Sequence, residues 1–463
     1  MFDKETYLRR RRALRAKIKS GLILFPANGE SPVNYPANGY HFRQDSNFLY
    51  YFGLNCPNLV GVIDVEADTS CLYGDDCTLD DIIWMGNQPT LREMGERVGV
   101  QHTFTMLELQ LMMTMAIRKG RRIHFLPPYR ESNVLLLKSL LGIKSDFIGN
   151  YVSEELIKAV VSMREVKEPQ EIEEIERACE TGYLMHTTAM KMCRPGIVER
   201  EIAGTIEGIA LSKGAGVSFI SIVSQNGETL HNHYYGNKLR PGRMLLIDAG
   251  AETDMNYCSD FTRTLPVTGR FTEQQKAVYD IVLAANNRTF ELIAPGVTYQ
   301  SIHLEAARVI AEGLKGLGLM KGSVDDIVEN GAYALFMPHG LGHQMGLDVH
   351  DMEDLGEKYV GYNEETERST MFGIGSLRMG RKLKEGHVLT VEPGIYFIPA
   401  LIDKWRGEKI NAAFLNYETI EKYLDFGGIR LEDDALVLAK GCRLLGKKRI
   451  PITAEEVEEA MRG

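Results

Sequence analysis

The chain lacks the features that mark membrane-spanning and secreted proteins. No apolar run in its 463 residues approaches the roughly 20 residues that cross a bilayer. The nearest run, from Leu109 to Ile117, is short and rich in methionine, and we expect a buried helix there. No apolar segment with a small-residue cleavage site follows the arginines at positions 9–12, so we expect no secretory signal.

An excess of positive charge is also lacking. The chain has 53 Lys and Arg against 63 Asp and Glu, which gives a net charge of -10. This balance argues against nucleic acid or an anionic membrane as the main partner. The seven cysteines are scattered, odd in number and include no CxxC pair, so we expect free thiols and a cytoplasmic protein.

The composition that remains is that of a soluble globular protein, with 44% hydrophobic and 25% charged residues. The length exceeds what one hydrophobic core usually organises, which predicts two domains. The first third alternates the strand-like runs GLILF, LVGVIDV and RRIHFLP with a helical stretch at 107–119, a pattern typical of an α/β domain.

A charged amphipathic stretch at 153–181, broken by Pro169, marks the predicted boundary between the domains. We therefore predict domains 1–160 and 161–463, with a long helix beginning near Pro169. Further helices are predicted at 199–213, 274–292 and 299–314, interleaved with strands. Thr453 and Glu456 form a capping-box pattern, which predicts a short final helix.

Five potential metal ligands lie in the C-terminal domain. They are Asp248 in LLIDAG, Asp260 in CSDFTRT, His343 in HGLGHQMGLDVH, Glu392 in TVEPGIY and Glu432 in IRLEDD. The four carboxylates stand in apolar, strand-like sequence, where each loses hydration unless a cation or hydrogen bonds replace it. One such residue alone would be read as a surface or ion-paired side chain, but five together predict a site for two divalent ions.

The spacing of residues around these ligands predicts strands with one polar and one apolar face. Phe261, Val391 and Leu431 alternate with the polar positions and should pack on the opposite side. The connector between Asp248 and Asp260 is compatible with two antiparallel strands that bring both carboxylates to one metal.

Several histidines lie near these motifs in the sequence. The glycines of HGLGHQMGLDVH predict a loop, which can fold His339, His343 and His350 around one centre. His231 is a candidate for the same site, whereas His233 is better explained as an ordinary surface residue. A ligand set rich in oxygen favours Mn²⁺, with Co²⁺, Fe²⁺ or Zn²⁺ as substitutes, and two such ions would activate water and polarise a carbonyl.

The runs IDAG, DFTRT, HGLGHQMGLDVHD, LTVEPGIYF and GGIRLEDD resemble, in order and spacing, the pita-bread metallopeptidases that act before proline, namely aminopeptidase P and prolidase. The segment HFRQDSNFLYYFGL resembles the N-terminal domain of the same family. The resemblance implies an α/β (α+β) protein, with a creatinase/aminopeptidase P-like domain followed by a pita-bread catalytic domain.

The resemblance also implies a role for each site residue. Asp248 would bind one metal, His343 and Glu392 the other, and Asp260 and Glu432 both. Glu392 would also act as general base, and His231 and His350 would steady the scissile carbonyl. His339 and Arg430 would contact the substrate. The family's metal is typically manganese, and its members are typically dimers or tetramers.

Two features resemble prolidases rather than aminopeptidases P. One is Arg378, in SLRMGRKLKEG, which would bind the free carboxylate of a dipeptide. The other is the insert at 399–426. We therefore expect an Xaa-Pro dipeptidase that acts on short peptides with proline in the second position. The alternative interpretation of Arg378 is an ordinary surface ion pair with no role in substrate binding. An Xaa-Pro aminopeptidase acting on longer peptides stays open, as do, more remotely, a non-catalytic pita-bread module and a metal-free creatinase-type hydrolase.

Overall fold

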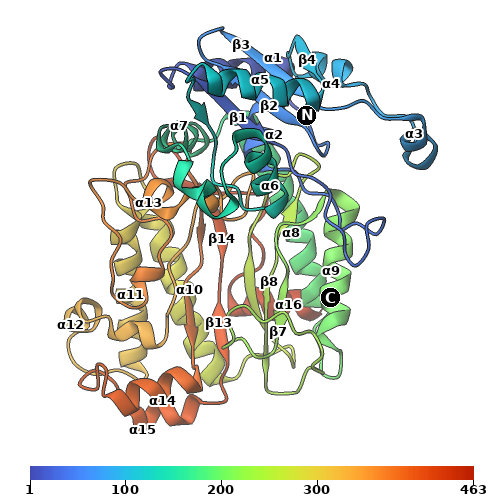
Figure 1. Cartoon of the computed structure of the whole chain (residues 1–463). Helices are drawn as coiled ribbons and strands as arrows, with labels where there is room; N and C mark the ends of the chain where they lie inside the picture. The colour runs from blue at the N-terminus through green and yellow to red at the C-terminus, as the bar shows by residue number, and fades with distance from the viewer. Residues whose placement is uncertain (463) are drawn as a thin grey trace. The chain divides into compact units, whose positions relative to one another are not determined.

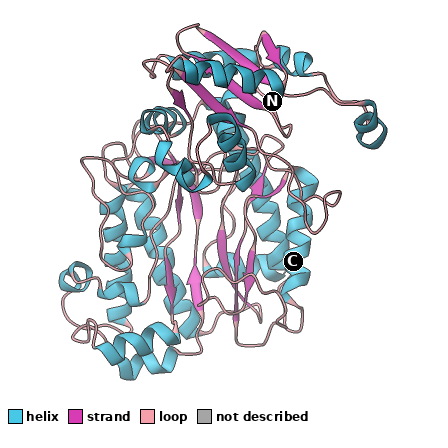
Figure 2. Ribbon diagram, in the orientation of Figure 1, coloured by secondary structure: helices cyan, strands magenta, loops and turns pink. Residues whose placement is uncertain are grey.

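The computed structural model describes residues 1–462 and divides into two compact units (Figures 1 and 2). Unit 1 comprises Met1–Arg164 and Asp354–Tyr359, and unit 2 comprises Glu165–Glu353 and Val360–Gly463. The short return of Asp354–Tyr359 to unit 1 had no signal in the sequence. Among residues 1–462, no helix has the length and hydrophobicity needed to cross a membrane.

Unit 1 is built around one mixed sheet with strand order β4-β3-β2-β1-β5. Its strands are β1 (Leu22–Pro26), β2 (Val60–Asp64), β3 (Thr69–Tyr73), β4 (His102–Phe104) and β5 (Ile123–His124). Its helices are α1 (Lys4–Arg15), α2 (Ser46–Phe52), α3 (Leu79–Met85), α4 (Leu91–Arg97), α5 (Met106–Arg118), α6 (Glu131–Leu141), η1 (Ser145–Tyr151) and α7 (Glu154–Arg164). The predicted helix at 107–119 is confirmed as α5, which buries Leu109 and Met113 against this sheet's core.

The strands of unit 2 lie between two sets of helices (Figure 1). One set contains α8 (Pro169–Met192), α9 (Glu199–Lys213) and α16 (Ala454–Arg462), and the other contains α10 (Glu273–Leu292) and α11 (Tyr299–Gly316). The predicted helices at these positions are confirmed. Pro169 opens α8 at its first turn, and Thr453 and Glu456 form the predicted capping box, with Glu456 N donating to Thr453 Oγ1 at 3.1 Å.

The strands of unit 2 form four small antiparallel groups, β10-β8-β7, β11-β14-β15, β12-β13 and β6-β9. These strands are β6 (Gly216–Val217), β7 (Ile222–Ser224), β8 (Met244–Asp248), β9 (Ala251–Glu252), β10 (Thr262–Pro266), β11 (Val388–Val391), β12 (Gly394–Tyr396), β13 (Gly428–Arg430), β14 (Asp433–Val437) and β15 (Cys442–Leu444). The remaining helical segments of unit 2 are α12 (Val324–Glu329), η2 (Ala332–Leu335), η4 (Ile374–Ser376), α14 (Pro399–Glu408), α15 (Tyr417–Ile420) and η5 (Glu421–Tyr423). Two further segments, η3 (Glu353–Leu355) and α13 (Glu357–Val360), contain most of the stretch that belongs to unit 1.

The core of unit 2 explains why the site strands have two different faces. Val391 and Leu431 are fully buried in the main hydrophobic cluster with α10 and α11, as predicted. Phe261 is also buried, and its ring meets His186 of α8 edge-on. Since successive side chains of a strand point to opposite sides, burial of these apolar residues directs their polar neighbours to the other side.

Candidate metal centre

Two antiparallel strands deliver the first pair of candidate ligands. Asp248 ends β8, and its register partner on β10 is Thr262. Asp260 stands two residues before that partner, so both carboxylates reach the same end of the strand pair. The predicted antiparallel arrangement is confirmed, and both residues are buried, with Asp260 only 4% exposed.

The two glutamates lie where neighbouring strands end. Glu392 directly follows β11, and its N–H donates to the carbonyl of Leu341 at 2.9 Å. Glu432 lies between β13 and β14, and its N–H donates to the carbonyl of Thr262 at 3.0 Å. This backbone bond places Glu432 next to the strand that carries Asp260.

The histidine loop, residues 339–350, contains no helix and runs beside β11, as its glycines predicted. The N–H of His343 donates to Thr390 Oγ1 and the N–H of Thr390 donates to the carbonyl of His343, both at 3.0 Å. A Cβ atom at Gly342 would lie 2.1 Å from the Thr390 carbonyl oxygen, so only glycine permits this approach. The pairing carries His343 to the carboxylates.

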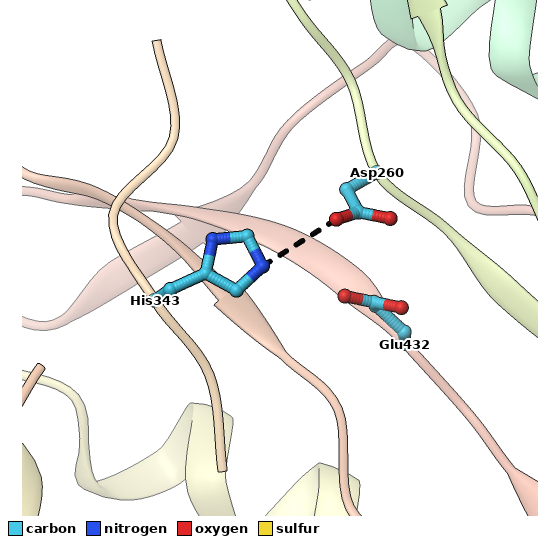
Figure 3. A group of neighbouring side chains, drawn as sticks. All are labelled: Asp260, His343 and Glu432. Carbon is cyan, nitrogen blue, oxygen red and sulfur yellow. Dashed lines mark ion pairs between the residues drawn. The ribbon is translucent and has the colours of Figure 1, made fainter. Parts of the chain in front are cut away.

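Asp260, His343 and Glu432 meet in one cluster, with their ligand atoms all within 4.8 Å of one another (Figure 3). His343 Nε2 lies 3.5 Å from Asp260 Oδ2 and 3.8 Å from Glu392 Oε1. The other ring nitrogen, Nδ1, lies 3.0 Å from the carbonyl of Gln344, which can only accept. Nδ1 therefore carries the proton, and the Nε2 lone pair faces the carboxylates, as in a metal-ligating histidine.

The electrostatics of the cluster favour a cation. Burial, followed by the charges of Glu432 and Asp248, holds the pKa of Asp260 well above its usual range. Burial also raises the pKa of Glu392 to about 7 and that of Glu432 well above its usual range. Asp248 Oδ1 and Asp260 Oδ1 are buried without a hydrogen-bond partner in residues 1–462. Such orphaned anionic oxygens fit a divalent metal.

Arg430 is the one cation that directly contacts this group of carboxylates in the described chain. Its Nη2 donates to Asp248 Oδ2 at 2.6 Å, its Nη1 to the Tyr396 hydroxyl at 2.8 Å, and its Nε to Thr262 Oγ1 at 3.1 Å. Thr262 in turn donates to Glu432 Oε2 at 2.6 Å. Arg430 lines the cavity as expected of a substrate contact, but its donors are directed to Asp248, Tyr396 and Thr262.

Comparison with known proteins assigns the chain to a family. Residues 173–439 match the model of metallopeptidase family M24, and residues 7–124 match the N-terminal domain of aminopeptidase P. The chain belongs to metallopeptidase family M24. The match covers more than half of the chain and includes all five candidate ligands of this M24 peptidase.

Relatives of this M24 peptidase include both proline-directed types. It is 33% identical to the human Xaa-Pro dipeptidase over 96% of the chain and 90% of that protein. It is 30% identical to a probable Xaa-Pro aminopeptidase of Metarhizium acridum over 86% of the chain and 77% of that protein.

Solved structures agree with the fold of both domains. Proline aminopeptidase P II of Yersinia pestis matches with a TM-score of 0.80 and 29% identity, and 100% of each chain is covered. Zinc-substituted Escherichia coli aminopeptidase P in complex with product matches with a TM-score of 0.81 and 29% identity, covering 100% of this chain and 98% of that one. The predicted pair of an aminopeptidase P-like domain and a pita-bread domain is confirmed.

The five candidate ligands of the M24 peptidase open onto a cavity of about 480 Å³ within unit 2. His231, His339, His350 and Arg378 also line it, so every predicted site residue lies around one space. His233 lines the same cavity although it is exposed, which the interpretation as an ordinary surface residue did not anticipate. Phe219, Ile220, Ile222 and Leu230 supply an apolar wall.

His339 is held neutral by its surroundings. Its Nδ1 donates to the Gly340 carbonyl at 2.7 Å, and its Nε2 accepts from the Tyr396 hydroxyl at 2.9 Å. Burial, together with the nearby charge of Arg430, lowers the pKa of His339 to about 3. An uncharged imidazole at this position suits contact with an uncharged part of a ligand.

The insert at 399–426 lies away from the cavity wall. It forms α14, α15 and η5, and Ile402, Trp405, Leu415 and Ile420 pack into the core of unit 2. Among the described residues that line the cavity, none comes from this insert. Any link between the insert and substrate length would therefore act indirectly.

Five residues in or beside the site were not singled out from the sequence. Tyr396 joins Arg430 to His339, and Asp434 accepts from the backbone N–H of Asp260 at 3.1 Å. Glu353 contacts His350 and Arg378, and Lys167 pairs with Asp351. Tyr396 and Asp434 lie within the runs LTVEPGIYF and GGIRLEDD, so their closeness to candidate ligands in the sequence could have identified them. Lys167 is distant in sequence from its partner and gave none.

Proposed function

We propose that the protein hydrolyses the peptide bond between an N-terminal residue and proline, with a preference for dipeptides. The observation that carries the proposal is the sharing of one cavity by five candidate metal ligands, four further histidines and Arg378. A cavity of about 480 Å³ is of the size that binds small molecules and short peptides. The similarity to the human Xaa-Pro dipeptidase over nearly the whole chain supports the specificity for proline.

The ligand set supports two divalent ions, for which we propose Mn²⁺, with Co²⁺, Fe²⁺ or Zn²⁺ as substitutes. Asp248 would hold one ion, His343 and Glu392 the other, and Asp260 and Glu432 would contact both. Four carboxylates and one neutral imidazole balance the charge of two such ions. When bound, the ions supply a nucleophile at neutral pH and Lewis-acid polarisation of the substrate carbonyl.

The chain's own residues then move the proton and orient the peptide. Glu392 would accept the proton of the attacking water. Its side chain lines the cavity and is 20% exposed, so it can reach a water molecule there. The scissile carbonyl would be steadied by His231 and His350. The space that the substrate occupies would be lined by His339 and Arg430. The apolar wall around Ile222 and Leu230 would exclude water from the peptide.

The preference for dipeptides rests on Arg378. Its guanidinium lines the cavity and is 34% exposed, so it can reach a substrate carboxylate. A free carboxylate directly after proline exists only in a dipeptide. The second candidate is an Xaa-Pro aminopeptidase. It is favoured by the pairing of Arg378 with Glu353, because an arginine that serves only in an ion pair within the protein would not select dipeptides.

The deciding experiment compares Gly-Pro with a longer Xaa-Pro peptide in the presence of Mn²⁺, alongside metal analysis of the purified protein. We expect two metal ions per chain and a higher kcat/KM on Gly-Pro. A higher kcat/KM on the longer peptide would establish the aminopeptidase instead. Absence of stoichiometric metal would favour the non-catalytic module, and full activity after exhaustive chelation would favour a metal-free hydrolase.

We further propose a cytoplasmic homodimer or homotetramer. Seven free cysteines, three of them buried, support a reducing compartment. The charge of -10 supports neither nucleic acid nor an anionic membrane as a partner. Sedimentation at several protein concentrations would test the oligomeric state.

A further inference from the structure

The carboxylate of Glu353 contacts two residues of the cavity at once. Its Oε2 accepts from His350 Nδ1 at 2.6 Å, and its Oε1 pairs with Arg378 Nη1. This carboxylate is 43% exposed, and the side chain of Arg378 is 34% exposed. The hydrogen bond from His350 lowers the pKa of Glu353 against the opposing effect of burial, and the charge of Arg378 acts in the same direction as that bond, so Glu353 is ionised at neutral pH.

The backbone is shaped to bring Glu353 back to His350. The two residues close a turn in which the N–H of Glu353 donates to the carbonyl of His350 at 3.2 Å. Met352, the third residue of the turn, has a φ of 63° and is fully buried. A non-glycine residue in this left-handed conformation carries a conformational cost and persists only where the surroundings hold it.

A buried ion pair anchors the same turn. Lys167 Nζ lies 2.8 Å from Asp351 Oδ2, and each side chain is only 1% exposed. The N–H of Asp351 also donates to the carbonyl of Gln344, next to His343. The position of Glu353 is therefore built into the loop that carries the histidines, and is unlike that of a freely moving surface side chain.

The pairing has a chemical consequence for substrate choice. A guanidinium binds carboxylates, and Glu353 presents to Arg378 the same group as the C-terminus of a dipeptide. A dipeptide must therefore displace Glu353 or bind against its charge. A peptide without a carboxylate at that position meets no such competition.

From this geometry we propose that Glu353 is a specificity-determining and positioning residue. It orients His350 through Nδ1, and it is a resting partner of Arg378 that a substrate carboxylate replaces. The proposal deepens the proposed function and rests on it, because it assumes that Arg378 receives the carboxylate. It predicts that Glu353 weakens the binding of free dipeptides relative to their amides.

The test uses Glu353→Gln, which keeps an oxygen acceptor for His350 and removes the competing charge. For a half-exposed ion pair we expect the KM for Gly-Pro to fall about threefold relative to the KM for Gly-Pro amide. Inhibition by free proline, measured against prolinamide, should strengthen by a similar factor. Glu365→Gln is the matched control, because it removes an exposed acid that pairs with Lys382 outside the cavity.

Two further variants separate specificity from positioning. In an Arg378→Ala background, Glu353→Gln should no longer change the ratio of the two KM values, because the guanidinium for which Glu353 and the substrate carboxylate compete is absent. Glu353→Ala, which also removes the acceptor for His350, should lower kcat on both substrates, and Gln at the same position should restore it. Thermal unfolding of each variant establishes that it is folded.

The outcomes distinguish the two proposals. Wild-type protein that hydrolyses neither Gly-Pro nor its amide, with Mn²⁺ bound, would overturn the proposed function and with it this inference. Wild-type protein that hydrolyses them, combined with equal changes of both KM values in Glu353→Gln, would overturn the inference alone. Persistence of the Glu353→Gln effect without Arg378 would also overturn it.

Discussion

Asp433 and Asp260 are both buried carboxylates in unit 2, and they differ in what compensates their charge. Asp433 lies 2.6 Å from the fully buried guanidinium of Arg263 and 2.9 Å from Arg449. Asp260 has Glu432, Asp248, Asp434 and Glu392 as its charged neighbours, and all four raise its pKa. The protein supplies cations to one carboxylate and leaves the other for an external cation.

Arg263 also joins the backbone segments on either side of the site. Arg263 donates to the carbonyls of Thr262, Glu432, Ile450 and Pro451 as well as to Asp433. It therefore joins the strand that follows Asp260 to the backbone of Glu432. Ion pairs inside the protein build the frame, whereas among the site carboxylates of the described chain only Asp248 is paired with an arginine, Arg430.

The largest expected effect comes from neutralising the carboxylates that lack cations. Asp260→Asn and Glu392→Ala should each lower kcat/KM on Gly-Pro by about 10²- to 10⁴-fold, because they remove a metal ligand or the proton acceptor. Asp280→Asn on the exposed face of α10 is the control and should retain full activity. Near-normal turnover in either site variant would show that the cage does not perform the chemistry.

The next largest effect is expected on stability, at Asp433, whose charge is compensated by arginines. Asp433→Asn leaves the fully buried Arg263 without its carboxylate partner, so the free energy of unfolding should fall by about 3–5 kcal/mol. The control Asp280→Asn removes a pair with Lys276 that is 41–50% exposed, and should cost less than about 0.5 kcal/mol. Urea unfolding measures both. Equal losses would mean that burial does not distinguish the two carboxylates.

Metal removal should destabilise the protein in a pH-dependent way. In the metal-free protein, burial raises the pKa of Glu392 from 4.5 to about 7, and burial also raises the pKa values of Asp260 and Glu432 well above their usual range. A raised carboxyl pKa lets the folded state keep protons that the unfolded state has released. The metal-free protein therefore loses stability as the pH rises from about 4.5 through about 7.

This prediction is checked by thermal unfolding with Mn²⁺ and with EDTA at pH 5.5 and pH 8. At 100 to 1,000 times Kd, bound metal adds about 3–4 kcal/mol, and the difference between the two conditions should be larger at pH 8. In the Asp260→Asn variant, the Tm with Mn²⁺ and the Tm with EDTA should differ less than in the wild-type protein. An equal shift in Tm at both pH values would contradict the account of uncompensated carboxylates.

The smallest effect on stability is expected at Arg378. Its pair with Glu353 is 34–43% exposed, so Arg378→Ala should change the free energy of unfolding by less than about 1 kcal/mol. The same variant should lose about tenfold or more in kcat/KM on Gly-Pro while largely sparing a longer Xaa-Pro peptide, because a charged hydrogen bond to the carboxylate is lost. Equal losses on both substrates would exclude the carboxylate-binding role.

Much of the fold could be predicted because its signals are local. The helix at Pro169, the capping box at Thr453 and the amphipathic stretches that form α5, α9, α10 and α11 depend on neighbours within a few residues. The strand pair that carries Asp248 and Asp260 is joined by a short connector, so its antiparallel pairing was also predictable. The return of residues 354–359 to unit 1 was not, since it depends on packing between distant segments.

The candidate ligands could be named from the sequence because buried acids in apolar strands are chemically costly and therefore conspicuous. The sequence alone was enough to name the side chains that we propose as metal ligands, and to predict an irregular histidine loop and two domains. Only the tertiary structure decided which acids are compensated, since Arg263 and Asp433 are 170 residues apart and Lys167 and Asp351 are 184 apart. Charge compensation is set by distances in space, and these arise only when the chain has folded.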